Sequence, residues 1–341
     1  MNALDSARES IRRHWLFRRD GTPGPQGGGA GGPGRIALRG IGIGLLVVIA
    51  VLLLYYPIGM IVAHRIDDNP DFTPPVQDQV SGGAKSVEMV AGLIDREVNL
   101  NNWVANDPIF LPGYFIDDTP NFQKGIKAAL ARFTFELTDQ IGRTRGSSQA
   151  DPDLQAAAGL LQYPADVWVW NPSVSWAPRA TSDSQYREAR KRLLAYNKRL
   201  AEGNAIFDKR ADNLLATLDR FAADLGSASA ASYGEVKNDA YGIFDFNADD
   251  IFYDTKGRIY GYYMILKALE QDFSGVIAEK NLQGPWDQMM ETFREAVLLQ
   301  PWFIINGDPD STMVPNHLTS QGFYLMRART QLREVTNILQ K

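Results

Sequence analysis

The sequence contains no cysteine and only three histidines, His14, His64 and His317. Without cysteine the chain has no disulfide bonds, no catalytic thiolate and no cysteine-ligated zinc or iron–sulfur site. The lack also suits an oxidising compartment, although many cytosolic proteins are cysteine-free as well. The histidines lie far apart along the chain, so they predict no shared metal site, and only His317 remains for acid–base chemistry. We therefore expect neither a metal nor a cofactor.

Charged residues are absent from 22 consecutive positions, Ile41–Val62. An α-helix of this length spans about 33 Å, which is enough for a hydrocarbon core about 30 Å thick. Tyr55 and Tyr56 stand toward one end, where amphipathic rings favour the membrane interface. Two other interpretations are a buried helix of a soluble domain and a cleaved signal peptide. The long leader and the length of the apolar stretch favour a transmembrane helix over both.

The charges on the two sides of this stretch differ in sign. Residues 1–40 carry seven arginines and three acidic residues, with a glycine-rich run, Gly21–Gly34, among them. Residues 41–341 carry 28 basic and 37 acidic residues, a net charge of −9. The positive-inside rule then predicts a single-pass protein with its N-terminus in the cytoplasm and most of the chain outside it. An acidic domain has no electrostatic reason to bind nucleic acid, so the lipid bilayer is the first partner expected.

Helical periodicity dominates after the membrane segment, and it predicts an all-α domain over 84–341. Residues 63–83 are rich in proline, glycine and aspartate, and they predict a stalk between the membrane and this domain. The longest predicted helix begins at Thr181 or Ser182 and continues to about Leu225, with a lapse at Gly203. The other predicted helices cover Lys85–Val98, Thr119–Ile141, 152–162, Asp249–Phe273, Pro285–Leu299 and Pro315–Leu339. Val167–Trp176 is rich in aromatic residues and predicts an extended arm.

Two stretches of the chain share an order of features: a helix, a tryptophan-led apolar strip, an Asn/Asp-Pro turn and a second helix. The matching residues are Trp103 and Trp302, Asp107 and Asp308, Pro120 and Pro315, Gly125 and Gly322, and Ala131 and Ala328. The tryptophan would anchor the loop in the core and the Asp–Pro pair would close the turn. His317 stands in the first turn of the second of these helices. We interpret the echo as two pseudo-symmetric helix–loop–helix repeats flanking the long helix, the alternative being a chance match of common turn residues.

One group of polar residues could bind an anion. Arg143 and Arg145 stand beside Ser147 and Ser148 after a predicted helix. Two arginines beside small hydroxyl residues can hold a phosphate or a carboxylate. Basic residues at the C-terminus of a helix also stabilise the helix dipole without any ligand, so both interpretations stay open.

Acidic pairs are the second group that could carry chemistry: Glu136 with Asp139, and Asp249–Asp250 with Asp254. Paired carboxylates act as acid and base in glycan cleavage, but at such positions they more often cap helices or pair with arginines. The sequence has no GxSxG, HExxH or Walker motif, and no GxGxxG followed by an alternating strand. The case for an enzyme is therefore weak.

Four segments carry a resemblance to a known family: WVANDPIFLPGYFIDDTPNFQKGI, FELTDQIGRTRGSSQADPDL, AYNKRLAEGNAIFDKRADNLLATLDRFAADLGSAS and PNHLTSQGFYLMRARTQLREVTNIL. With them, most of residues 45–341 resembles a family of bacterial single-span membrane proteins known only as a domain of unknown function. The resemblance implies an inner-membrane setting in proteobacteria. It implies no activity, substrate or catalytic residue.

The function we expect from these features is that of a non-enzymatic protein of the cell envelope. It would be anchored in the bacterial inner membrane, with a periplasmic helical domain that scaffolds or helps to assemble another envelope protein of unknown identity. Rigid helices, an aromatic arm and a tether suit protein–protein contact, where Trp and Tyr supply most of the binding energy. Two alternatives remain: an anion-binding or sensing module that uses the Arg143 and Arg145 loop, and a cell-wall hydrolase that uses the paired carboxylates.

Overall fold

The computed structural model describes residues 33–142, 150–172, 176–238, 246–301, 303–308 and 314–341. Within them the chain is helical and contains no strand, which confirms the predicted all-α class. The α-helices are α2 Pro33–Ala63, α3 Lys85–Asp95, α4 Asp118–Glu136, α5 Pro152–Leu161, α6 Ser182–Ala201, α7 Ala211–Asn238, α8 Phe246–Asp272, α9 Ser274–Glu279, α10 Gln283–Val297 and α11 His317–Leu339. Short 3₁₀ turns cover Val76–Asp78 and Pro112–Phe115, and π turns cover Arg96–Leu100 and Leu137–Ile141.

The chain divides into two compact units, Met1–Leu53 and Leu54–Lys341, and the second holds the helical domain. Helix α2 contains an apolar stretch, Gly40–Ala63, of 24 residues with a mean hydropathy of 2.7. None of that stretch is buried against the rest of the chain. The predicted apolar helix over Ile41–Val62 is confirmed, and its length and composition are those of a helix that can cross a membrane.

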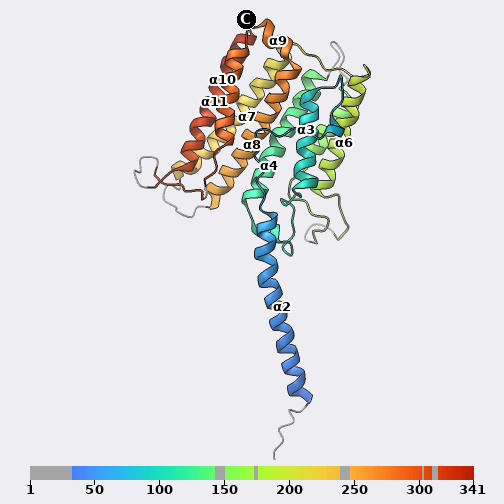
Figure 1. Ribbon diagram of the computed structural model, residues 1–341, viewed down its shortest axis with the longest axis vertical. Helices are drawn as coiled ribbons and strands as arrows, with labels where there is room; N and C mark the ends of the chain where they lie inside the picture. Colours follow the sequence, from blue (N-terminus) through green and yellow to red (C-terminus); the bar gives the residue numbers. More distant parts are fainter. Residues whose placement is uncertain (1–32, 143–149, 173–175, 239–245, 302, 309–313) are drawn as a thin grey trace, which may run out of the picture. The chain divides into compact units, whose positions relative to one another are not determined.

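Helix α8 is the central element of the domain. It contacts α3, α4, α7, α9, α10 and α11, and Figure 1 shows it among the other long helices. Its eight consecutive residues 259–266 are all buried, so no face of this part of the helix meets solvent. A surface helix needs one apolar stripe, whereas a helix enclosed by others is apolar all round. The tyrosines Tyr260 and Tyr262 satisfy their hydroxyls within the protein, on the carbonyl of Asn69 and the carboxylate of Asp224.

Helices α4 and α8 run parallel and approach each other closely because three glycines lie between them. A Cβ atom on Gly125 would overlap the carbonyl oxygen of Asp254 on α8. A Cβ atom on Gly257 would overlap the carbonyl oxygen of Phe122 on α4, and one on Gly261 would press on Ala129. The small residues therefore fix the spacing of the two helices, and the backbones themselves form much of the contact.

The predicted long helix is two helices. Helix α6 ends at Ala201 and α7 begins at Ala211, and between them Gly203 adopts φ of +77°, a left-handed conformation that glycine takes without steric cost. The amide of Asn204 returns to the carbonyl of Arg199, which closes the helix end. The sequence indicated this break only as a lapse in the apolar pattern. The two pseudo-symmetric repeats therefore do not flank one continuous helix.

The helix starts depend on acidic caps. Asp151 accepts hydrogen bonds from the amides of Asp153 and Leu154, and Pro152 occupies the first helical position, as the sequence predicts. Helix α4 begins one residue before the predicted Thr119, with Asp117 accepting from the amide of Asp118. A proline two positions into the helix is compatible with this earlier start, because the first turn needs no amide donor there.

Residues 66–80, expected as part of a stalk, lie along the domain as a strap. Phe72 packs against the core, and Pro74 and Pro75 pack on Gly92 of α3. The carboxylate of Asp78 is buried and pairs with Arg190 of α6 at 2.7 Å. The prolines and aspartates of this segment thus serve packing and ion pairing.

Two buried cations join the strap to the domain. The ammonium of Lys256 on α8 is 2% exposed and lies 2.6 Å from the carboxylate of Asp68, which Gln300 also contacts through its amide. Arg96, at the end of α3, is equally buried and reaches Asp67 at 3.5 Å and Glu97 at 2.7 Å. Burial lowers the pKa of Lys256, and Asp68 opposes this shift by favouring the charged form.

We predict that Asp68→Ala destabilises the protein by about 3–5 kcal/mol, because it leaves the buried ammonium of Lys256 without its counter-ion. The double variant Asp68→Ala/Lys256→Met removes both charges and should recover most of this loss. The measurement is urea unfolding of the full chain in detergent micelles, followed by circular dichroism.

The matched control is Glu188→Ala, which removes one partner of the exposed pair between Arg192 and Glu188. Its effect should stay within about 0.5 kcal/mol, the range of surface ion pairs. If the double variant is no more stable than Asp68→Ala alone, the loss does not come from an unpaired buried charge.

Candidate functional site

The structure does not describe the predicted anion-binding loop. Arg143, Arg145, Ser147 and Ser148 lie outside the described residues, and so does Trp302 of the proposed repeat. The ligand interpretation of these arginines therefore stays a prediction. Asp308 is described and exposed.

The other residues singled out from the sequence hold loops in place. Trp103 is buried, donates its indole N–H to the carbonyl of Ala165 at 2.8 Å, and packs edge-on against the ring of Tyr186. Partial burial raises the pKa of Asp107 to about 6. His317 accepts the amide of Ile305 through Nδ1 at 3.0 Å, and its own amide donates back to the carbonyl of Ile305. Burial lowers the pKa of His317, in keeping with a neutral imidazole that accepts this bond.

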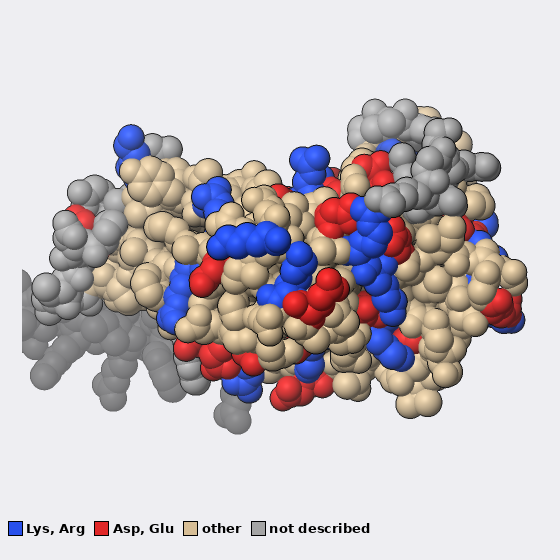
Figure 2. All heavy atoms as spheres, turned by 90° about the horizontal axis from the view of Figure 1, so that it is seen from above, with Lys and Arg blue, Asp and Glu red and all other residues tan. Residues whose placement is uncertain are grey.

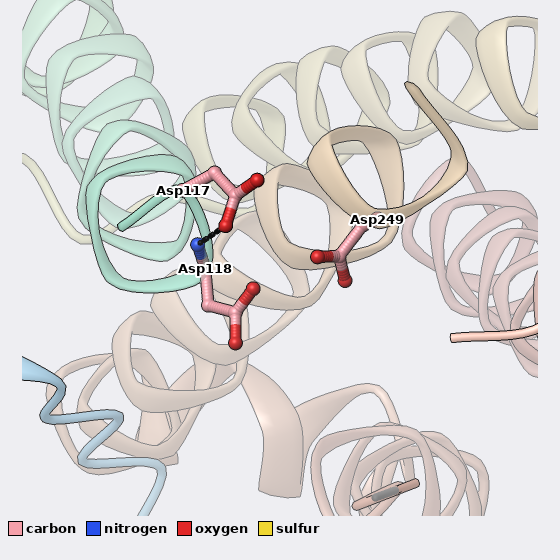
Figure 3. A group of neighbouring side chains, drawn as sticks. All are labelled: Asp117, Asp118 and Asp249. Atoms are coloured by element: carbon pink, nitrogen blue, oxygen red, sulfur yellow. Dashed lines mark hydrogen bonds between the residues drawn. The ribbon is translucent and has the colours of Figure 1, made fainter. Parts of the chain in front are cut away.

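A cluster of three carboxylates was not predicted as a site. Asp117 and Asp118 stand at the start of α4 and Asp249 on the first turn of α8, and Figure 3 shows their side chains in the space between the two helices. One oxygen of each lies within 4.8 Å of the others. A carboxylate oxygen of Asp118 lies 3.7 Å from Nδ1 of His64, which follows the end of α2. The end of α2 and the first turns of α4 and α8 therefore meet at this cluster.

The electrostatics of the cluster follow from partial burial and from like charges. Partial burial, the hydrogen bond to Asp118, and the charges of Asp118, Asp117 and Asp250 together raise the pKa of Asp249 to about 8. Asp249 therefore carries its proton at neutral pH and can donate it to the carboxylate of Asp118. Partial burial also raises the pKa of Asp118.

The arrangement offers two chemical roles. Three carboxylate oxygens at this spacing could contribute to a Ca²⁺ or Mg²⁺ site, whose remaining ligands would be water or backbone oxygens. The structural role is simpler, because the positive ends of two helix dipoles meet here and acidic side chains stabilise such ends. The sequence shows an Asp–Asp pair at the start of each helix, which could have indicated the cluster. It does not show that α4 packs beside α8.

Two of the other predicted carboxylates pair with arginines. Glu136 is buried between Arg132 at 3.9 Å and Arg220 at 3.8 Å, and Asp254 binds Arg258 at 2.7 Å. These contacts agree with the ion-pair interpretation of the acidic residues. Asp250 instead accepts a hydrogen bond from the side-chain amide of Asn121 at 2.6 Å.

A second feature is an apolar groove of about 310 Å³ between α7 and the first turns of α11. These two helices pack against each other in an antiparallel arrangement. Tyr233, Phe323 and Met326 line the groove and are 68%, 61% and 58% exposed. The remaining lining residues are Ser229, Ser232, Val236, Leu318, Thr319 and Gly322. None of the lining residues is charged, so the groove is an open apolar surface on the described part of the domain.

The two proposed repeats differ in the surroundings of their matching glycines, and the glycine of the second repeat lines the groove. Gln123 of α4 and Gln321 of α11, which stand two residues and one residue before the matching glycines, are both fully buried and both donate to backbone carbonyls. Gly125 then packs directly on the backbone of α8, as described above. An added Cβ on its counterpart Gly322 meets nothing within 4 Å. A glycine that allows close helix contact in the first repeat thus faces open space in the second.

The charged surface shows no field of one sign. On the face drawn in Figure 2, Lys and Arg side chains are interspersed with Asp and Glu side chains. A surface of this kind gives no continuous basic track for a nucleic acid on that face. The apolar groove is a more distinctive feature than the distribution of charge.

Comparison with known proteins gives one match. The sequence model of the bacterial family DUF2333, described as an uncharacterized protein conserved in bacteria, matches residues 41–241 and 244–341. No curated protein and no solved structure matches the chain.

We predict that the shared proton of Asp249 makes stability depend on pH. The folded-state pKa of about 8 lies above the ordinary value of 3.8, so the proton stabilises the fold fully below a pH of about 4 and this contribution is lost as the pH rises through 8. Asp249→Asn keeps a hydrogen-bond donor to Asp118 and cannot ionise. Its melting temperature should match that of the wild type near pH 4 and exceed it by on the order of 2–4 °C near pH 9.

The control is Asp219→Asn, a change at an exposed carboxylate on α7. It should leave the difference between the two pH values unchanged. An equal offset between Asp249→Asn and the wild type at every pH would show that Asp249 titrates normally. If Ca²⁺ instead raises the melting temperature of the wild type near pH 9 and not that of Asp249→Asn, the cluster is a metal centre.

Proposed function

The chain belongs to the bacterial family DUF2333, and from this premise we propose that it is a single-span inner-membrane protein that holds another envelope protein. Its N-terminal tail is cytoplasmic and its helical domain lies in the periplasm. The domain acts without catalysis, as a scaffold or assembly factor. The observation that carries the proposal is the open apolar groove between α7 and α11.

The groove favours a helix as its occupant. It runs between two packed helices, and a third helix laid along such a furrow completes a bundle by the ridges-into-grooves geometry of ordinary helix packing. Gly322 and the serines Ser229 and Ser232 leave room for close approach, while Tyr233 and Phe323 supply rigid aromatic contact. Because the lining is uncharged, it favours contact with the apolar face of an amphipathic helix. Docking of such a helix in an apolar groove is a common mode of peptide recognition.

The tether and the charge distribution support the placement. Helix α2 has the length and hydropathy of a membrane span. The seven arginines of residues 1–40, set against a net charge of −9 beyond them, favour a cytoplasmic N-terminus under the positive-inside rule. A tethered domain is held close to other envelope proteins, which raises its effective concentration toward them.

The carboxylate geometry gives less support to a cell-wall hydrolase. In glycosidases the two carboxyl groups lie on either side of the scissile bond. They are about 5–5.5 Å apart in retaining enzymes and about 6.5–9.5 Å apart in inverting enzymes. One carboxylate oxygen of Asp118 lies within 4.8 Å of one of Asp249, a spacing that leaves too little room for a sugar ring between the two groups. Glu136 pairs with Arg132 and Asp254 pairs with Arg258, so neither carboxylate is free to act as an acid or a base.

We predict the topology from this proposal. Alkaline phosphatase, which is active only outside the cytoplasm, should be active when fused after Lys341, and green fluorescent protein at the same place should be dark. An N-terminal epitope tag should remain on the membrane-bound chain. Fluorescence from the C-terminal fusion would place the helical domain in the cytoplasm and contradict the proposed orientation. Loss of the tag from the mature chain would identify α2 as a cleaved signal.

We predict that a photo-crosslinking amino acid at Phe323 or Met326 captures an apolar helical segment of one envelope protein in intact cells. Gly322→Trp should fill the groove, since a Cβ atom added at Gly322 meets nothing within 4 Å. It should reduce that crosslink at least about tenfold, the effect of losing about 1.4 kcal/mol of binding free energy. Mass spectrometry of the crosslinked peptide is the measurement.

The control position is Val76 on the strap, which is 84% exposed and apolar but lies outside the groove. The same amino acid there should not capture the segment. Crosslinks that persist unchanged in Gly322→Trp, or that appear equally from Val76, would contradict docking in the groove. Cleavage of peptidoglycan by the purified full chain would contradict the non-enzymatic role.

A further inference from the structure

The loop between α3 and α4 exposes an uncharged aromatic surface. Its nine residues Pro108–Ile116 carry no charge. Within it Ile109, Phe110, Tyr114 and Phe115 are between 50% and 62% exposed. Four adjacent large apolar side chains on one surface loop are unusual in a soluble domain, and such surfaces commonly meet a partner or a membrane.

This loop is packed on the last turns of α2. The hydroxyl of Tyr55 donates to the carbonyl of Phe110, and that of Tyr56 donates to the carbonyl of Ile109, each at 3.3 Å. The rings of Tyr56 and Phe115 meet edge to face, 5.1 Å between centroids. A Cβ on Gly59 would overlap the ring of Pro112, so this ring lies directly against the helix. The loop and residues 55–59 thus stand at the same level along α2.

The length of the apolar stretch places that level at the edge of the bilayer. The 15 residues Gly40–Leu54 reach only about 22 Å, which is too short for a hydrocarbon core of about 30 Å. About 20 residues are needed, and counting from Gly40 they end at Gly59. If the helix spans the membrane, the turn Tyr55–Gly59 lies inside the outer edge of the hydrocarbon, and the loop beside it lies there too.

The aromatic arm predicted from the sequence extends the same surface. The ring of Trp168 stacks edge-on against that of Phe110, with 6.2 Å between centroids. Further along the arm Trp170 is 54% exposed and Trp176 75% exposed, and the indole of Trp170 donates to the carbonyl of Trp176. Tryptophan and tyrosine favour the interfacial region of membranes, where an apolar ring and a polar tip are both satisfied.

We propose that this surface, the loop Pro108–Ile116 with Trp170 and Trp176, inserts into the lipid bilayer at the boundary of headgroups and acyl chains. The domain then has a second attachment to the membrane beside its helix. This proposal rests on the proposed function in one respect, the crossing of the membrane by α2. Arg65, which follows the helix and donates to the carbonyl of Leu100, stands where a basic side chain can reach lipid phosphates.

The test uses the absence of cysteine, which allows single labels on the full chain. An environment-sensitive fluorophore is attached to Phe110→Cys, Tyr114→Cys, Ile49→Cys or Glu279→Cys, and each protein is reconstituted in phosphatidylcholine vesicles. The vesicles contain lipids brominated near the top or near the end of the acyl chains, because bromine quenches only nearby fluorophores. Glu279 is exposed at the end of α9, at the opposite end of α8 from Asp249.

We expect the labels at Phe110 and Tyr114 to be quenched most by bromine near the top of the chains, as for groups about 5–10 Å into the boundary. The label at Ile49 should be quenched by bromine near the chain ends, and the label at Glu279 by neither. Quenching at Ile49 without quenching at Phe110 and Tyr114 overturns the insertion of the loop and leaves the membrane anchor intact. Absence of quenching at Ile49 overturns the anchor, and the loop proposal falls with it.

Discussion

The fold depends on the pairing of two buried cations with the strap that follows the apolar helix α2. Lys256 and Arg96 carry their charges into the core, where an ammonium or guanidinium is stable only beside a counter-ion. Asp68 and Asp67 supply those counter-ions from adjacent positions of the strap. The central helix α8, the end of α3 and the chain that follows α2 are thereby tied at one place. Apolar packing alone would leave the strap free to slide, whereas an ion pair of this kind fixes its register.

The same end of the domain gathers negative charge. The first turns of α4 and α8 begin side by side because glycines let the two helices pack closely, and each start brings an Asp–Asp pair. The shared proton of Asp249 resolves the repulsion that results. His64 and Arg65, which follow α2, contact Asp118 and Thr119 at the start of α4, so the end of α2 lies beside the acidic cluster.

The sequence predicted those features that depend on local pattern. The apolar span, the all-α class and the start of α5 at Asp151 follow from runs, stripes and caps that a few neighbouring residues define. The break at Gly203 was missed as a helix end because Leu200 and Phe207 continue the apolar spacing across it. Each side of that break could have been helical, and only the left-handed backbone of Gly203 decides where the chain turns.

Features that depend on distant parts of the chain were not predictable in this way. The strap resembled a stalk because its prolines and aspartates are typical of loops, and its partners Lys256 and Arg190 stand far along the chain. The carboxylate cluster needs the pairing of α4 with α8, which no local pattern encodes. The groove depends on a gap beside Gly322, whereas Gly125, in the same sequence context, has a neighbour. The predicted anion-binding loop lies outside the described residues and remains a prediction.

The strap also determines how the domain would respond to force. A partner that pulls on the groove transmits tension through α7 and α11 to α8, and from α8 to the membrane through the chain at Asp67 and Asp68. A flexible stalk would lengthen under such tension and absorb it. Here the pull meets ion pairs enclosed in the core, which must be sheared together before the strap can extend. Lengthening of the strap would therefore require the pairs of Asp67 with Arg96 and of Asp68 with Lys256 to break.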